Sequence, residues 1–349
     1  MVLRSRRLDH RRQQAATARS PVARSSPLNT FTRLLARFAQ GVVVVIIASS
    51  VAFLLSRMLP GDEFTALLSS PNISAERVEQ LRAQFGDNTS WLHQYFVWLG
   101  SLLHGDLLWS KSQREPVTQA IARALPHTLQ LMGLAFSTSI IGGILLGTWQ
   151  ATRQGSVAER IASGVTFTIF SLPDFWVAML LQLIFAFSLG WLPFGGKTDF
   201  SQNLTVVELI QQQFRYTLLP WASLTLVDVA VFARYQRAAV RDVLGQQFLR
   251  TARAKGVPES DITWKHTLRV ALLPMITITG MYFPALLVGA ILIETVFSWP
   301  GVGQLLIKAV EGRDYFLVSS IVVIGSAMTA LGSFLADVTR EFADPRLRT

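Results

Sequence analysis

The sequence predicts an all-α integral membrane protein whose chain crosses the bilayer six times. Half of its 349 residues are hydrophobic and only 15% are charged, whereas soluble domains average about 25% charged residues. Six apolar stretches come close to the roughly 20 residues that a helix needs to cross a bilayer core. None of them alternates polar and apolar residues as the strands of a membrane barrel do, so helices are expected throughout.

The six stretches cover residues 38–59, 128–151, 161–189, 218–233, 274–295 and 316–338. Pro173 interrupts the third stretch, which predicts a kink or a break into two pieces at that point. The fourth is the shortest and contains Asp228. It is still counted as a span, because an even number of crossings returns the C-terminus to the starting side.

Lysine and arginine residues predict the orientation, because the cytoplasmic loops of membrane proteins are enriched in them. Most of the 32 basic residues lie in 1–37, in the gaps after the second and fourth stretches, and in the tail. With six spans these segments all face one side, so both termini are predicted to be cytoplasmic.

Residues 1–30 lack apolar periodicity and are expected to form a basic, disordered arm. The rest divides into a first helix with its outer loop (31–125) and a core domain (126–349).

Composition excludes several classes of function. The formal net charge is +10, but the basic residues lie in a tail and between apolar blocks rather than on a recognition module, so nucleic acid is not expected as a partner. The chain has no cysteine, which excludes disulfides, thiol catalysis and cysteine metal sites. Its five histidines make no close pair and no catalytic constellation stands out. Neither a metal site nor a catalytic residue is therefore predicted.

One segment looks like the end of a phosphate-binding loop. Gly195-Gly196-Lys197-Thr198 matches the last positions of that loop, but the loop also needs a glycine at position 191, where the chain has Trp191. The segment is interpreted as a turn. No nucleotide or other cofactor is expected to bind to this chain.

Small and acidic residues inside the spans stand out. Gly143 and Gly147 form a small-xxx-small pair of the kind that lets helix backbones approach in a membrane. Asp174, Asp228 and Glu294 lie in or at the edge of spans, where a central charge costs about 2.5–3.5 kcal/mol on insertion scales. Each acid is expected to face protein or a water-filled path. For each, a structural hydrogen bond and a role in a translocation path both remain open.

The predicted cytoplasmic loop 241–274 is the most informative segment. A helix is predicted over 248–255, and Gly256-Val257-Pro258 ends it with a glycine and a proline in the expected order. Residues 258–261 then open a second short helix, with Glu259 and Asp261 in its first turn. A short amphipathic helix that projects from a membrane domain is either a docking element or an interfacial helix lying on lipid.

The same segment resembles the cytoplasmic signature of binding-protein-dependent ABC importers, which reads Glu-Ala-Ala, three residues, Gly, nine residues, Ile-x-Leu-Pro. Arg250-Thr251-Ala252 stands at the opening, Gly256 is the glycine, and His266-Thr267-Leu268-Arg269 fills the closing position. The departures from the signature are similar to those of the oligopeptide, dipeptide, nickel and glutathione branch. Further segments resemble that branch over about residues 30–349: Leu59-Pro60-Gly61-Asp62, Gly105-Asp106-Leu107, Leu125-Pro126-His127-Thr128-Leu129, 171–176, 189–193, 294–301, Arg313-Asp314-Tyr315 and Asp344-Pro345-Arg346.

The resemblance implies a type I ABC importer permease fold in a bacterial inner membrane. It implies a second, homologous permease subunit, two cytoplasmic ATPase subunits that use ATP and magnesium, and an extracytoplasmic solute-binding protein. The permease itself would be non-catalytic and would alternate between inward-open and outward-open states. The solute would be a peptide, nickel or a metal chelate, or glutathione. The residues implied in the ATPase-coupling loop are Arg250, Thr251, Ala252, Gly256, Pro258, Glu259, Asp261, His266 and Leu268.

Two other classes of protein are alternatives. An ion-coupled secondary transporter would show inverted repeats and midplane ligands on broken helices, for which Pro173 with Asp174 is the only hint. A membrane-embedded enzyme or sensor would need a reactive constellation or a large soluble output domain, and the sequence offers neither. Copurification with an ATPase subunit would separate the importer from both.

Overall fold

The computed structural model describes residues 27–58, 76, 90–197 and 205–343, so most of the predicted arm 1–30 lies outside the described residues. The elements in chain order are α2 (Pro27–Met58), α5 (Trp91–Leu103), β1 (Trp109–Ser110), β2 (Glu115–Pro116), α6 (Val117–Thr152), α7 (Val157–Phe170), α8 (Asp174–Leu181), a π-helical segment (Gln182–Ser188), α9 (Val206–Leu244), α10 (Gln247–Ala254), α11 (Glu259–Asp261), a second π-helical segment (Ile262–Thr267), α12 (Leu268–Val296), α13 (Val302–Glu311) and α14 (Tyr315–Ala343). The described chain is mainly helical, as predicted, apart from the two-residue antiparallel strands β1 and β2.

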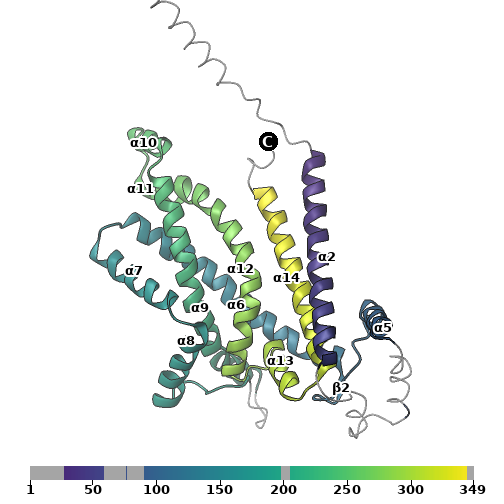
Figure 1. Cartoon of the computed structure of the whole chain (residues 1–349). Helices are drawn as coiled ribbons and strands as arrows, with labels where there is room; N and C mark the ends of the chain where they lie inside the picture. The colour runs from purple at the N-terminus through teal and green to yellow at the C-terminus, as the bar shows by residue number, and fades with distance from the viewer. Residues whose placement is uncertain (1–26, 59–75, 77–89, 198–204, 344–349) are drawn as a thin grey trace, which may run out of the picture.

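Figure 1 shows how the long helices are arranged. The N-terminal end of α2, the C-terminal end of α14 and the helices α10 and α11 all lie at one end of the molecule. The strand β2 and helix α13 lie at the opposite end. This arrangement agrees with the predicted alternation of loops between two sides.

Four helices within the described residues are long and apolar enough to cross a membrane: Thr32–Leu55, Val117–Thr152, Val206–Leu244 and Tyr315–Thr339. The bent pair Val157–Phe170 and Asp174–Ser188 makes a fifth if both parts count as one span. The remaining predicted stretch, 274–295, forms part of the 29-residue helix α12. Length and composition thus give four or five spans, fewer than the six predicted from the sequence.

The break predicted at Pro173 is present. Helix α7 ends before Ser171, α8 begins at Asp174, and the two helices are bent by 105°. Proline has no backbone N–H and disfavours a helical conformation in the residue before it. The chain therefore leaves one helix and starts another within three residues.

Close backbone packing holds the two longest helices, α6 and α9, together. A Cβ added to Gly143 would lie 2.3 Å from the Cβ of Phe232, and one added to Gly147 would lie 2.4 Å from the carbonyl oxygen of Ala233. Both distances are far shorter than van der Waals contact, so only glycine permits this approach. Since hydrophobic burial gives membrane helices little drive to associate, such contacts supply the packing. The packing role predicted for Gly143 and Gly147 is confirmed within the subunit.

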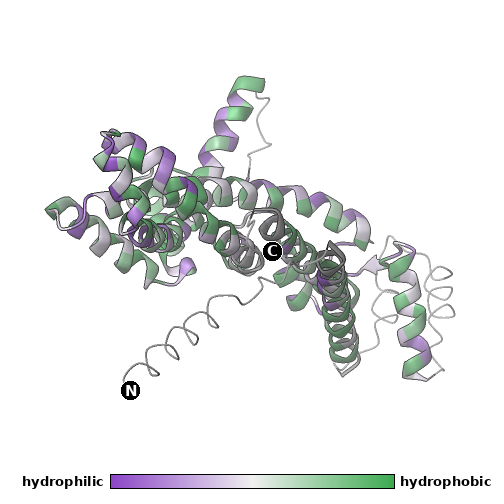
Figure 2. Cartoon of the chain, turned by 90° about the horizontal axis from the view of Figure 1, so that it is seen from above, coloured by the Kyte–Doolittle hydropathy of each residue, from purple (hydrophilic) through white to green (hydrophobic). Residues whose placement is uncertain are grey.

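Helices α2 and α14 lie side by side next to this core (Figure 1). The Oγ of Ser50 on α2 lies 2.8 Å from the Tyr95 hydroxyl on α5. Helix α14 approaches α12 at Gly280, where an added Cβ would lie 2.1 Å from the Cβ of Ala336. Hydrophobic residues cover outward faces of the helices (Figure 2), and Ile47 of α2 is 57% exposed. An apolar exterior of this kind suits contact with lipid.

Candidate functional site

Residues 247–267 form a helical knob, made of α10, α11 and the π-helical segment Ile262–Thr267. Helix α10 ends in a Schellman motif, in which the N–H of Val257 donates to the Ala252 carbonyl (3.2 Å) and that of Gly256 donates to the Arg253 carbonyl (2.9 Å). This motif places the residue after the C-cap in the left-handed region, and Gly256 has a φ of +79°. The helix stop predicted at Gly256 is confirmed.

The second half of the knob differs from the prediction. Helix α11 begins at Glu259 directly after Pro258, as expected, but it is not a separate short helix. It continues through Ile262–Thr267 into α12 without a gap. No glycine or proline occurs between residues 259 and 273, so nothing in the sequence interrupts the helix. The knob is a direct extension of a long core helix.

Two ion pairs fix the shape of the knob. The Nε of Arg253 on α10 donates to Oε1 of Glu259 on α11 (2.7 Å), and Lys265 Nζ lies 2.7 Å from Asp261 Oδ2. The hydrogen bond that the Arg253 guanidinium donates to the Glu259 carboxylate raises the pKa of Arg253. Both predicted acidic residues are therefore paired inside the knob: Glu259 links α11 to α10, whereas Asp261 and Lys265 lie one turn apart on the same helix.

The inner face of the knob is apolar and fully buried. Leu249 and Ile262 have no exposed surface and belong to one cluster with Val240 of α9 and Ala151 of α6. The knob is thus packed on the ends of the two core helices. A displacement of the knob must move those helix ends, because a close-packed cluster transmits strain.

The outer face of the knob combines aromatic and basic side chains. Phe248 is 42% exposed and Trp264 is 50% exposed. Of the predicted loop residues, Arg250, Thr251, Gly256, Pro258, Glu259 and His266 are exposed, while Ala252, Asp261 and Leu268 are partly buried. Sequence reasoning omitted the anchors Leu249 and Ile262, although their apolar side chains among polar neighbours were a usable signal.

The structure brings two of the three predicted intramembrane acids together. Asp228 on α9 is 4% exposed, and one of its carboxylate oxygens has no hydrogen-bond partner among the described residues. The carboxyl group of Asp228 interacts electrostatically with that of Asp174 and with the Tyr282 hydroxyl on α12. Tyr282 was not predicted, although it is the one tyrosine in the stretch 274–295. Glu294 instead bonds to Thr128 and to the start of α13.

The segment Gly195-Gly196-Lys197 is a turn, as predicted. Gly196 has a φ of +90°, and its N–H donates to the carbonyl of Phe297 (2.8 Å). The Lys197 ammonium lies 2.7 Å from Nδ1 of His127, and burial lowers the pKa of that lysine. The lysine is thus held by the protein itself.

Within the described residues no group of three or more His, Cys, Asp or Glu side chains could hold a metal ion. The fold and the knob define the class of molecule: a polytopic helical membrane protein with a rigid helical knob at one end.

Comparison with known proteins then identifies the family. The chain belongs to the binding-protein-dependent transport system inner membrane components, which match residues 143–349, and the N-terminal region of the same systems matches residues 30–132.

Several curated proteins are similar over most of this chain. The oligopeptide transport system permease protein AppB of Bacillus subtilis (strain 168) is 33% identical, over 90% of this chain and 98% of that protein. The di/tripeptide permease protein DppB of Pseudomonas aeruginosa (strain UCBPP-PA14) is 32% identical, over 85% and 92%. The glutathione permease protein GsiC of Escherichia coli O6:H1 is 34% identical, over 86% and 94%.

The fold also matches a solved transporter. An inward-facing structure of the MetNI methionine ABC transporter superposes with a TM-score of 0.53 at 16% identity, over 65% of this chain and 97% of that one. The chain is therefore a permease subunit of the ABC importer type, and the resemblance inferred from its sequence is confirmed. Nothing in these comparisons supports an ion-coupled transporter.

Proposed function

We propose that the chain is one of two permease subunits of an ATP-driven importer for peptides or a related small solute, such as glutathione or a metal chelate. The named functions of AppB, DppB and GsiC support this solute class. Two ATPase subunits on the cytoplasmic side would hydrolyse ATP with magnesium, and this chain would bind no cofactor and catalyse no reaction. The knob, both termini and the ATPases would share that side of the bacterial inner membrane.

The observation that carries the proposal is the construction of the knob. Exposed Phe248 and Trp264 suit insertion into a groove, because large aromatic side chains dominate binding energy at protein interfaces. Leu249 and Ile262 join the knob to α9 and α6 from behind. Movement of a docked ATPase would therefore reach the core helices directly and rock them between inward-open and outward-open states.

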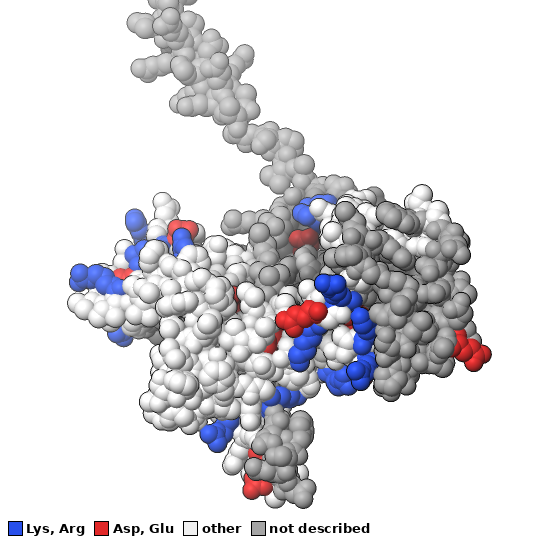
Figure 3. Space-filling view, turned by 60° about the horizontal axis from the view of Figure 1, so that its bottom comes forward, with Lys and Arg blue, Asp and Glu red and all other residues white. Residues whose placement is uncertain are grey.

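The opposite end of the molecule would receive the solute-binding protein. Lys111, Arg114, Arg123, Lys308 and Arg313 are exposed there, and Figure 3 shows basic side chains gathered on this end together with a few acidic ones. Asp314, the residue before α14, holds the segment that joins strands β1 and β2. Its Oδ2 accepts hydrogen bonds from Ser110 Oγ (2.6 Å) and from the N–H of Ser112 (2.8 Å). Basic side chains on a rigid support suit an acidic partner surface.

Copurification followed by uptake tests the function. The tagged chain is coexpressed with the ATPase, permease and binding-protein genes adjacent to its own, purified, and reconstituted in proteoliposomes. Peptide uptake is expected only with ATP, and the double variant Phe248→Ala/Trp264→Ala is expected to lose the ATPases. Trp176→Ala, which removes an aromatic side chain that is 43% exposed on α8, is the matched control and should retain them. Uptake driven by an ion gradient without ATPases would overturn the proposal.

A further inference from the structure

Helix α5 is a short helix without charged residues that lies beside α2. Its 13 residues (Trp91–Leu103) include no Asp, Glu, Lys or Arg, and they are too few to cross a bilayer, which takes about 20. One side of α5 packs on the end of α2 that lies away from the knob (Figure 1). The ring centre of Phe53 lies 5.4 Å from those of Tyr95 and Trp98, and Trp98 is 3% exposed. This side of α5 is therefore fixed to the bundle.

A second side of α5 carries an apolar stripe. Its members occupy positions i, i+4, i+7 and i+11, which share one face of a helix; they are Leu92, Phe96, Leu99 and Leu103. Leu92 is 70% exposed, Phe96 is 64% exposed and Leu103 is 82% exposed. A contiguous apolar surface of this kind marks a site of interaction with a protein or a membrane.

The surroundings of α2 show which way the stripe faces. Leu99 and Leu103 line an apolar pocket of about 550 Å³ together with Val42 and Ile46 of α2. Val42 and Ile46 lie in the middle of the apolar span Thr32–Leu55, whereas the aromatic contacts of α5 lie nearer to the end of that span. The stripe is therefore turned toward the apolar middle of the span.

The direction and the level of α5 match those of a helix that lies in a membrane interface. It is foreshortened in Figure 1, where α2 stands upright, and it is seen along its length from above in Figure 2. Ser50, which contacts the Tyr95 hydroxyl, lies five residues before the end of the span at Leu55, or about 8 Å along the helix axis. Interfacial helices bury their apolar face to about 5–10 Å, which is the same depth.

A third side of α5 is polar. His93 and His104 each follow a residue of the stripe directly, which turns them by about 100° around the helix axis, and both are exposed. The helix thus has one side on the bundle, one apolar side and one polar side between them and the solvent.

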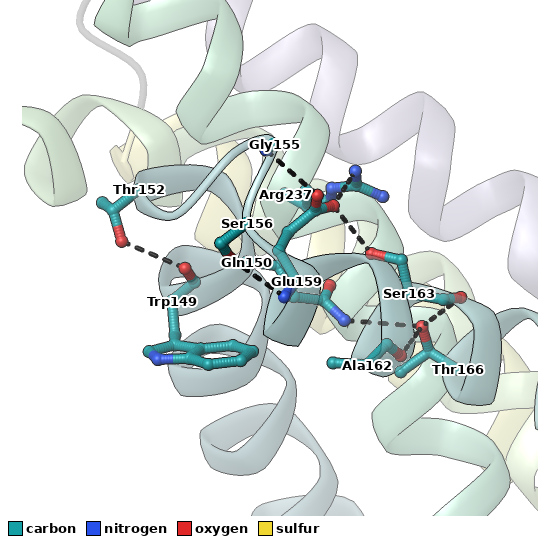
Figure 4. A network of polar contacts seen from close by, with 10 residues as sticks. All are labelled: Trp149, Gln150, Thr152, Gly155, Ser156, Glu159, Ala162, Ser163, Thr166 and Arg237. Carbon is teal, nitrogen blue, oxygen red and sulfur yellow. Dashed lines mark hydrogen bonds and ion pairs between the residues drawn. The ribbon is translucent and has the colours of Figure 1, made fainter.

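A polar network, by contrast, holds α7, which is similar in length at 14 residues. Its Glu159 accepts a hydrogen bond from the Ser163 hydroxyl (2.9 Å) and forms an ion pair with Arg237 of α9 (Figure 4). Helix α5 has no Asp, Glu, Lys or Arg with which to form such an ion pair. Its stripe offers only apolar contact, and acyl chains provide the matching surface.

We propose that α5 is an interfacial helix, which lies in the plane of the membrane in the leaflet opposite the knob. Phe96 and Leu103 would contact the acyl chains of phospholipids, and His93 would lie among the headgroups. Lipid is the partner because the stripe continues the exposed apolar face of α2, on which Ile47 is 57% exposed and Val51 is 49% exposed. The proposal goes beyond the proposed function and does not depend on which solute is carried.

Single-cysteine variants of the full-length chain test this placement, because the chain has no cysteine of its own. Phe96→Cys, Leu103→Cys and His93→Cys are each labelled with a nitroxide and reconstituted in vesicles of phosphatidylethanolamine and phosphatidylglycerol. Electron paramagnetic resonance measures collisions with oxygen, which concentrates among acyl chains, and with a nickel chelate, which stays in water. The labels at Phe96 and Leu103 are expected about 5–10 Å below the headgroup boundary, and the label at His93 should be shallower.

Two further sites calibrate the measurement. Ile47→Cys places a label on the exposed face of the span in α2 and should be deeper, whereas Glu311→Cys places one on an exposed residue of α13 and should be in water. Leu92→Cys replaces either stripe variant that is poorly produced. Chelate collisions at the stripe as frequent as at Glu311 would overturn the proposal. Protection of the stripe from both reagents would also overturn it, because a protein contact would then cover α5.

Discussion

The Oε2 atom of Glu294 lies 2.7 Å from the backbone nitrogen of Gly303 and accepts its hydrogen bond. The same oxygen accepts from the N–H of Gln304 (3.2 Å), and Oε1 accepts from the Thr128 hydroxyl (2.6 Å). A Cβ on Gly301 would lie 2.2 Å from the carboxylate, so glycine leaves the space that the carboxylate fills. Glu294 on α12 therefore caps the start of α13 and ties both helices to α6.

Glu294→Ala is expected to destabilise the chain. It leaves the N–H of Gly303 and the hydroxyl of Thr128 buried without an acceptor, at about 1–3 kcal/mol for each donor. Glu294→Gln keeps the size of the side chain and should cost less. Thermal unfolding of the purified chain in detergent measures the change. Glu311→Gln is the control: it changes an exposed residue near the other end of α13 and should leave the unfolding temperature unchanged. Equal stability of Glu294→Ala and the wild type would rule out the capping role.

The charge distribution predicts the topology of the chain. Reporter fusions after residues 116 and 205 should be extracytoplasmic, and fusions after 154, 256 and 349 should be cytoplasmic, because basic residues concentrate in the second group of segments. Alkaline phosphatase and green fluorescent protein fusions report the two sides. A cytoplasmic signal at residue 205 would contradict the predicted number of spans before α9.

Asp228→Asn tests whether the buried acids line the solute path. The change keeps the size and the hydrogen bonding of the side chain but removes its charge. If Asp228 contacts a cationic group of the solute, uptake should fall about tenfold or more, since a hydrogen bond to a charged group contributes about 1.5–3 kcal/mol. Subunit assembly should survive. Asp174→Asn should behave alike, because the two carboxyl groups interact electrostatically.

Asp337→Asn is the control for both variants, since Asp337 pairs with Arg37 between α14 and α2 (3.5 Å). Uptake at the wild-type rate by Asp228→Asn and Asp174→Asn would assign the acids a structural role. Loss of assembly in the same variants would lead to the same conclusion.

Local features of the fold could be predicted from the sequence. The break at Pro173 and the stop at Gly256 follow from the conformations that proline and glycine permit. The length of α9 could not be predicted, because it extends from Val206 to Leu244 whereas the apolar stretch covers only 218–233. Charged residues such as Arg215 and Arg237 flank the apolar stretch, but the helix continues through them.

Contacts between segments that are distant in the chain could not be predicted from the sequence. Thr128 and Glu294 are 166 residues apart in the chain, and no periodicity links a carboxylate in one helix to the backbone of another. The helix α13 was also missed, because a helix of 10 residues is far shorter than a membrane span. Asp174 and Asp228 could be predicted as notable residues because a charged side chain is costly to insert into a membrane. Their interaction with each other could not be predicted, because it depends on how α8 packs against α9.

The knob gives the strongest test of the proposed coupling to an ATPase. Gly256 has a φ of +79°, and a Cβ added there would meet nothing within 4 Å. Any effect of Gly256→Val therefore comes from backbone strain, about 1–2 kcal/mol for a residue in the left-handed region, rather than from a clash. That strain is too small to unfold the helical bundle, but it misplaces α10 relative to α11. The variant should insert at normal levels and lose ATPase association or solute-stimulated ATP hydrolysis.

Gly245 provides the matched control at the other end of α10. Its φ is −77°, and the nearest atom to an added Cβ is 3.8 Å away, so Gly245→Ala should retain ATPase binding. Glu259→Gln removes the ion pair with Arg253 across an exposed surface, so docking should weaken by a smaller amount that shrinks as salt is raised. Pull-down with the ATPases at low and high salt measures both effects. Wild-type transport by Gly256→Val and also by a deletion of residues 259–264 would show that the knob does not couple this permease to ATP hydrolysis.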